Sequence, residues 1–273
     1  MSVKTLLAAS TIVAATTGAA YADKLDDIIS AGEIRCGIML DAPPVGLRDN
    51  DNNPIGYDVE VCKDMAAALG VDAVIVETPS PDRIPSLLSD RVDVSISSAG
   101  NSLERAKSIS FSIPYQVWDQ SIAVAASDES ITGVSALEGK TIGTLRGSTG
   151  EAAFLKDLSD GKWSGAKTVS FGSNAEQFLA LNQGKVDAII EGTAILNEYQ
   201  KGPGEGKIKI ATVWEGGPID YAGIMVKRAD TGFLNWINLF VWHQVKDGRI
   251  DALYKQWFGY PAPNMSLDGV GSY

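Results

Sequence analysis

The stretch LLSDRVDVSI (87–96) is repeated in outline by LNQGKVDAII (181–190). Each reads as the end of a helix, a tight turn and then a buried strand. Apolar residues ahead of the two stretches also correspond, Ile84 with Phe178. Similarity over so short a stretch can arise by chance. It nevertheless favours two similarly built α/β lobes over one large sheet.

Outward from these copies, strand-like and helix-like segments alternate along the chain, which indicates parallel sheets covered by helices, the α/β class. The second lobe is expected to begin after SIAVAAS (121–127), and a long amphipathic helix is expected to follow the strand IDYAGIMV (219–226). Extended segments that cross between two lobes leave a cleft, where small ligands bind. The other expected strands are IRCGIM (34–39), AVIVET (73–78), VDVSIS (92–97), KTIGTL (140–145), VSF (169–171) and VDAII (186–190).

Composition excludes several classes of function. The 273 residues carry a formal net charge of −11, which argues against nucleic acid as a partner, because phosphate binding needs clustered Lys and Arg. One His and two Cys exclude a His-rich metal site and a dense disulfide scaffold. GxxxxGK[ST] and GxGxxG motifs are both missing, which argues against a nucleotide-phosphate loop. We therefore expect no cofactor and no metal.

The first residues indicate export. Residues 1–22 have a Lys, an apolar run and the ending Ala20-Tyr21-Ala22, the pattern of a cleaved signal peptide, and the run is short and Thr-rich for a membrane anchor. The mature chain is expected to begin at Asp23 and to be periplasmic. In an oxidising space Cys36 and Cys62 either form a disulfide or remain two buried thiols, and the sequence leaves both possibilities open.

Two turns carry the candidate binding residues. Ser98 and Gly100 follow the strand VDVSIS, and Arg105 is expected in the first turn of a helix, where it can form a forked pair with a carboxylate. In the second lobe Ser148 and Thr149 follow the strand KTIGTL. Ser148 also has capping-box spacing to the Glu three residues later, so a purely structural role stays open.

Several motifs together resemble the periplasmic solute-binding proteins of polar amino-acid ABC importers, the bacterial extracellular solute-binding proteins of family 3. Their order and spacing, more than any single motif, carry the resemblance over nearly the whole mature chain. They are IGYDV (55–59), RIPSLL (83–88), VDV (92–94), ERAK (104–107), FSIPY (111–115), LEGKTIG (137–143) and YKQWFG (254–259).

The resemblance implies a type II periplasmic binding protein fold, with two crossover strands and a central ligand cleft. Lobe 1 would comprise 23–120 and 221–273, and lobe 2 would comprise 121–220. Arg105 would hold the ligand carboxylate, with Ser98, Gly100, Ser148 and Thr149 around it. The protein would be a monomer, not an enzyme, and would deliver its small-molecule ligand to an ABC permease in the inner membrane.

The chain departs from the family pattern where the ligand ammonium is usually held. The usual Asp is replaced by Gly192, and the nearest carboxylate is Glu191. Neighbouring strand residues face opposite sides, so Glu191 can substitute only if the strand end kinks. Arg83 is either a surface residue or a second anion-binding group that favours an acidic ligand, and Asp41 is a further candidate in the cleft. The usual aromatic positions hold Ala42 and Pro81.

An enzymatic alternative remains. The same fold includes cyclohexadienyl dehydratase-like proteins, in which a cleft carboxylate acts as general acid, and a buried Glu191 would suit that role. The lone His243 is expected to be structural or solvent-facing, so nucleophilic catalysis that depends on a His is not expected.

Overall fold

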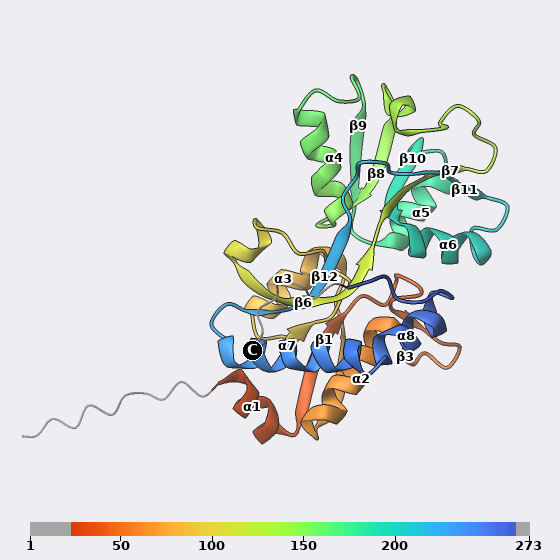
Figure 1. Cartoon of the computed structure of the whole chain (residues 1–273). Coiled ribbons are helices and arrows are strands. Elements are labelled where there is room, and N and C mark those ends of the chain that lie inside the picture. Colours follow the sequence, from red (N-terminus) through yellow and green to blue (C-terminus); the bar gives the residue numbers. More distant parts are fainter. Residues whose placement is uncertain (1–22, 266–273) are drawn as a thin grey trace, which may run out of the picture.

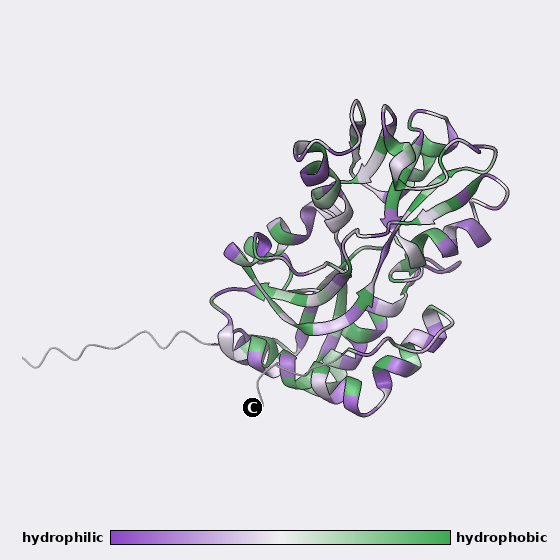
Figure 2. Cartoon of the chain, turned by 45° about the horizontal axis from the view of Figure 1, so that its top comes forward, coloured by the Kyte–Doolittle hydropathy of each residue, from purple (hydrophilic) through white to green (hydrophobic). Residues whose placement is uncertain are grey.

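The structure is a computed structural model that describes residues 23–265, and it has two lobes (Figure 1). The predicted signal peptide lies outside these residues. Each lobe is built on one five-stranded sheet, and hydrophobic residues run through the strands of both (Figure 2). The two-lobed α/β architecture predicted from the sequence is therefore confirmed.

The sheet of lobe 1 has the strand order β4-β1-β5-β12-β6. Its helices are α1, α2 and α3 from the first part of the chain, with α7 and α8 from the last part. The bounds are α1 Lys24–Ala31, β1 Glu33–Ile38, α2 Tyr57–Leu69, β4 Asp72–Glu77, α3 Arg83–Leu88, β5 Val94–Ser95, β6 Ile109–Trp118, β12 Asp220–Lys227, α7 Thr231–Lys246 and α8 Arg249–Trp257. A small antiparallel pair, β2 (Leu47–Arg48) and β3 (Pro54–Ile55), precedes α2.

The sheet of lobe 2 has the order β11-β7-β10-β8-β9 and carries α4, α5 and α6. The bounds are β7 Gln120–Ala125, β8 Thr141–Leu145, α4 Thr149–Ser159, β9 Lys167–Phe171, α5 Asn174–Asn182, β10 Ala188–Gly192, α6 Thr193–Lys201 and β11 Ile208–Val213. Short 3₁₀ turns are η1 (Ser80–Asp82), η2 (Arg105–Lys107) and η3 (Val134–Leu137).

The two sheets have the same topology, which explains the internal repeat. In one, β1 is parallel to its neighbours β4 and β5; in the other, β8 is parallel to β9 and β10. The repeated stretches end in β5 and β10, which are equivalent strands.

The prediction of parallel sheets holds for three neighbouring strands of each sheet, but both sheets are mixed, because the strand that follows each crossover runs antiparallel to its neighbours. β12 enters lobe 1 antiparallel to β5 and β6, and β7 enters lobe 2 antiparallel to β10 and β11. The chain changes lobe between Trp118 and Gln120, and again between Val213 and Asp220. The lobe boundaries given above stay a prediction.

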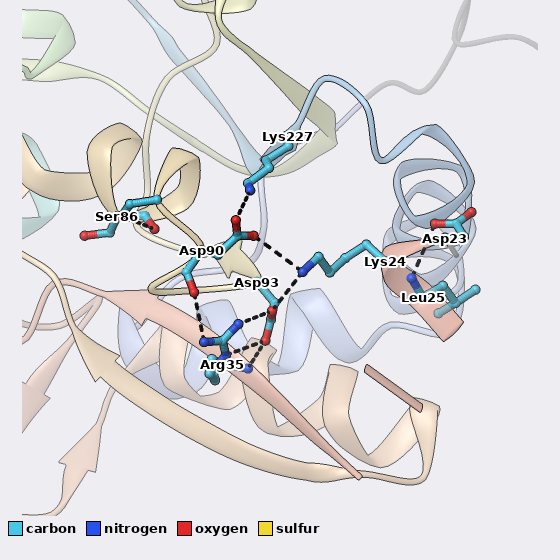
Figure 3. A network of polar contacts seen from close by, with 9 residues as sticks. Asp23, Lys24, Leu25, Arg35, Ser86, Asp90, Asp93 and Lys227 are labelled. Carbon is cyan, nitrogen blue, oxygen red and sulfur yellow. Dashed lines mark hydrogen bonds and ion pairs between the residues drawn. The ribbon is translucent and has the colours of Figure 1, made fainter. Parts of the chain in front are cut away.

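Covalent and ionic contacts fix lobe 1. Cys36 of β1 and Cys62 of α2 form a disulfide, so of the two alternatives left open by the sequence the bridge is the one observed. Figure 3 shows how α1 is held: Lys24 lies 3.6 Å from a carboxylate oxygen of Asp90 and 3.5 Å from one of Asp93. Arg35 pairs with Asp93 at 2.7 Å.

Candidate ligand cleft

A narrow cavity of about 20 Å³ lies between the lobes, room for about one water molecule. Both crossover segments reach it, through Trp118 and Gln120 on one and Asp220 on the other. Six of the eight predicted site residues line it, whereas Arg105 and Asp41 lie outside the lining. The six are Arg83, Ser98, Gly100, Ser148, Thr149 and Glu191.

Arg105 joins the two lobes. Its Nη1 donates to the Gly100 carbonyl at 2.5 Å, and its Nη2 donates to the carbonyl of Gly147, in lobe 2, at 2.7 Å. Burial lowers its pKa, against the opposing charge of Asp220. The expected helix at Arg105 is wrong: Arg105 begins a single 3₁₀ turn.

The Ser98 turn is held from behind by buried side chains. The Ser98 Oγ donates to Asp58 at 2.9 Å, and the Tyr115 hydroxyl accepts from the Ser98 N–H while donating to Asp58 at 2.8 Å. These bonds hold Ser98 at φ +48°, a left-handed conformation that costs energy for Ser. Burial raises the pKa of Asp58 to about 7. The hydroxyl of Ser98 therefore positions the turn and points its proton away from the cavity.

In lobe 2, Ser148 is the N-cap of α4. Its Oγ accepts from the Glu151 N–H at 3.0 Å, so the structural role left open by the sequence is present. Glu151 in turn accepts from the Gly147 N–H at 2.7 Å. Thr149, the first residue of α4, lies 3.4 Å from Arg105 Nη1 through its Oγ1.

Arg83 is buried, so it is not a surface residue. Its guanidinium donates to the Ser80 carbonyl and hydroxyl, to the Ser97 carbonyl and to the Gly147 carbonyl, at 2.7 to 3.1 Å. Burial, with the charge of Arg105, lowers its pKa to about 10. Most of its donors are already used by backbone and hydroxyl oxygens of both lobes.

Asp41 makes another contact between the lobes. Its Oδ2 accepts from the N–H of Asn174, the first residue of α5, at 2.8 Å. Burial raises the pKa of this carboxyl, and the nearby charge of Arg83 acts in the opposite direction.

Glu191 reaches the cavity from the end of β10. Its Oε1 accepts from the Gly192 N–H at 2.8 Å, and its buried Oε2 has no hydrogen-bond partner among residues 23–265. Burial raises its pKa to about 7. Gly192 packs under Trp118, because a Cβ there would lie 3.0 Å from two atoms of the indole ring. An Asp at 192 would therefore require the ring of Trp118 to shift.

Sequence reasoning missed Asp220, the first residue of β12. It is 4% exposed, and its Oδ2 accepts from Gln120 Nε2 at 2.7 Å. Burial raises its pKa, against hydrogen bonding from Thr149 and Gln120 and the charge of Arg105. The sequence does contain an indication of Asp220, because each crossover strand begins with a polar residue ahead of an apolar run. These residues are Gln120 and Asp220.

Outside the cleft, His243 is exposed on α7 beside Asp247. Within residues 23–265, no group of three or more His, Cys, Asp or Glu side chains is arranged to hold a metal ion. Over the same range, none of the helices has both the length and the apolar character needed to cross a bilayer.

Comparison with known proteins identifies the family. The model of the bacterial extracellular solute-binding proteins, family 3, matches residues 34–260. The chain belongs to this family. It is 26% identical to ABC transporter arginine-binding protein 1 of Escherichia coli (strain K12), over 93% of this chain and 99% of that protein. It is 25% identical to the L-cystine-binding protein TcyJ of the same strain, over 91% of each chain.

A solved structure of similar architecture is the ancestral amino acid-binding protein AncCDT-1, described as a precursor of cyclohexadienyl dehydratase. The TM-score is 0.76, with 29% sequence identity over 87% of this chain and all of that one. The members of this family compared here are named as binding proteins for different amino acids, so membership supports solute binding without fixing the solute.

Proposed function

We propose that this protein captures a small carboxylate-bearing amino acid in the periplasm and delivers it to an ABC importer in the inner membrane. The observation that carries the proposal is Arg105, whose guanidinium contacts both lobes at the cleft. A guanidinium in that position pairs with a carboxylate in forked geometry. Relatives named as ABC transporter binding proteins support the same role.

Binding begins on lobe 1, where Arg105 and the Ser98–Gly100 turn form one surface. When the lobes separate, Arg105 loses the Gly147 carbonyl, and its Nη2 becomes free for the ligand carboxylate. Closure at the two crossovers then brings Ser148 and Thr149 of lobe 2 onto the ligand. Micromolar affinity corresponds to about −8 kcal/mol, which a buried charge pair with several hydrogen bonds can supply.

The distribution of charge does not favour an acidic ligand. Arg83, the residue on which that expectation rested, already donates to oxygens of both lobes. Three carboxyl groups, Asp41, Glu191 and Asp220, stand at the cleft, and each has its pKa raised by burial. A second ligand carboxylate would meet this negative charge.

The test is a thermal-shift screen of the mature protein against amino acids and organic acids, repeated with Arg105→Ala. We expect at least one amino acid to raise the unfolding temperature of the wild type and none to do so in the variant. Arg91→Ala, which removes an exposed arginine outside the cleft, is the matched control and should respond like the wild type. Undiminished ligand stabilisation in Arg105→Ala would refute the proposed role of Arg105.

Glu191 supports a second candidate function. A buried carboxyl group with a pKa of about 7 can donate a proton to a leaving hydroxyl at neutral pH. Such a group would act as general acid in a dehydratase of the cyclohexadienyl type. Incubation of the purified protein with prephenate or arogenate decides this candidate: product that disappears in Glu191→Gln supports it, and no turnover in the wild type excludes it.

A further inference from the structure

Five charged side chains lie at or beside the cavity, and the carboxyl groups among them mark two ends. Arg105 and Asp220 lie together, since Gly100, which accepts from Arg105, would bring a Cβ within 2.1 Å of Asp220 Oδ1 and 2.7 Å of Thr149 Oγ1. Glu191 interacts electrostatically with Asp41 as well as with Asp220. Arg83 belongs to both ends, since its charge acts with those of Arg105, Asp220 and Glu191, and it shares the Gly147 carbonyl with Arg105.

The α-carboxylate and α-ammonium of an amino acid are attached to the same carbon. Their partners must therefore be neighbours. Asp220 is the carboxylate next to Arg105, and the charge of each acts on the other. It is also buried, it lines the cavity, and it lies on the strand that enters lobe 1 at the crossover.

The end with Asp41 and Glu191 is left for the ligand side chain, and it brings two carboxyl groups. When all five groups are ionised, the two arginines and three carboxylates leave one negative charge in excess. Asp58, the remaining buried carboxyl nearby, lies behind the Ser98 turn and accepts from Ser98 and Tyr115. The buried Oε2 of Glu191 has no partner in the described part of the chain, and Glu191 lines the cavity.

We propose that Asp220 binds the α-ammonium of the ligand, that Glu191 with Asp41 binds a cationic side chain, and that the solute is a basic amino acid. This inference rests on the proposed function. A ligand with net charge +1 neutralises the charged groups of the cleft, whereas a zwitterion leaves one carboxylate uncompensated in a buried site. Gly192 leaves no side chain that competes with Asp220, since the ring of Trp118 fills that space.

The test uses arginine and two analogues in isothermal titration. Citrulline keeps the shape of arginine but has a neutral side chain, and 5-guanidinopentanoate lacks only the α-ammonium. In the wild type we expect each analogue to bind about 10- to 100-fold more weakly than arginine, the usual loss for a buried hydrogen bond to a charged group. This arm needs no variant.

Two variants assign the loss to residues. For Asp220→Asn, we expect 5-guanidinopentanoate to bind less than about 3-fold more weakly than arginine, and citrulline to bind at least 10-fold more weakly than arginine. For Glu191→Gln, we expect the reverse pattern. Asp72→Asn and Glu205→Gln, which alter exposed carboxylates, are the controls and should match the wild type. Circular dichroism checks that each variant is folded.

The outcomes separate the two proposals. Citrulline, glutamine or glutamate binding as tightly as arginine would overturn the basic ligand class while leaving the proposed function intact. If 5-guanidinopentanoate binds Asp220→Asn about 10- to 100-fold more weakly than arginine does, as in the wild type, the proposed role of Asp220 is overturned. Failure of every amino acid to bind the wild type would refute the proposed function itself.

Discussion

At the scale of single residues, the cleft is defined by how its charges are satisfied. Arg83 donates hydrogen bonds to oxygens of both lobes, and so does Arg105. One carboxylate oxygen of Glu191 has no hydrogen-bond partner within residues 23–265. A buried carboxyl without a cationic partner favours its neutral form. The state of Glu191 should therefore depend on pH and on the ligand.

The sign of this dependence follows from the pKa. Burial raises the pKa of Glu191 from 4.5 to about 7, against the bond from Gly192 and the charge of Arg83, and in the same direction as the charges of Asp41 and Asp220. Between these values the folded protein binds more protons than the unfolded chain, so stability falls as pH rises. From pH 5 to 8, urea unfolding should show the wild type losing about 2 to 3 kcal/mol more than Glu191→Gln.

The basic-ligand proposal predicts the opposite trend for binding. A cation beside Glu191 favours its ionised form, so the affinity for arginine should rise as pH passes through about 7 and then level off. Titration of the wild type and Glu191→Gln at pH 5.5, 7 and 8 measures this. Glu205→Gln should follow the wild type. Equal slopes in wild type and Glu191→Gln would show that Glu191 does not sense the ligand.

Sequence reasoning found most of the residues of the cleft but not all of their roles. Arg105, Gly100 and Thr149 follow the ends of predicted strands, and this pattern can be read from the sequence alone. Ser98 is predicted to contact the ligand, but its hydroxyl is bonded to Asp58, which lies 40 positions earlier in the chain. Asp220 was missed because its environment comes from Gly100, Thr149 and Gln120, which are brought together only by the crossovers.

At the scale of elements, the Gly100 turn and the N-terminus of α4 fit closely across the cleft. Gly100 forms an isolated antiparallel bridge with Ala222 of β12, and Asp220 and Thr149 leave no space for a Cβ at Gly100. The close approach requires glycine because of space, not because of its φ angle.

Gly100→Ala should therefore hold the lobes apart. A Cβ there would lie 2.1 Å from Asp220 Oδ1 and 2.7 Å from Thr149 Oγ1, so both side chains must move, and overpacking of this kind typically costs 1 to 3 kcal/mol, or about 5- to 150-fold in affinity. Titration of the ligand found by the screen measures the loss, and small-angle X-ray scattering measures the separation. Gly133→Ala is the control, because a Cβ there meets no atom within 4 Å. Wild-type affinity in Gly100→Ala would contradict the tight approach.

The order of helices and strands along the chain could be predicted more completely than the pairing of strands within the sheets. Alternating strand and helix patterns gave the right class, and the repeat at 87–96 and 181–190 gave two lobes. Periodicity does not predict that β7 and β12 run antiparallel within their sheets, because a buried apolar run reads the same whichever neighbour it pairs with. The disulfide was left open for a similar reason, since its geometry depends on packing of α2 on β1.

At the scale of the whole molecule, two sheets of equal topology are joined by two crossover segments, and the cavity lies at these crossovers. The crossovers place Gln120 and Asp220 in contact at 2.7 Å beside the cavity. The proposed ligand site therefore shares residues with the crossovers, and we expect ligand charge and lobe closure to be coupled. The net charge of −11 belongs to the whole sequence, whereas the proposal assigns the choice of solute to five charged groups inside it.

The most direct test is a crystal structure of the mature protein with the amino acid that the screen selects. The account predicts a ligand between the lobes, with its carboxylate paired to Arg105 and its α-ammonium within hydrogen-bonding distance of Asp220. A ligand bound outside the cleft, or bound within it without contact to Arg105, would contradict the account.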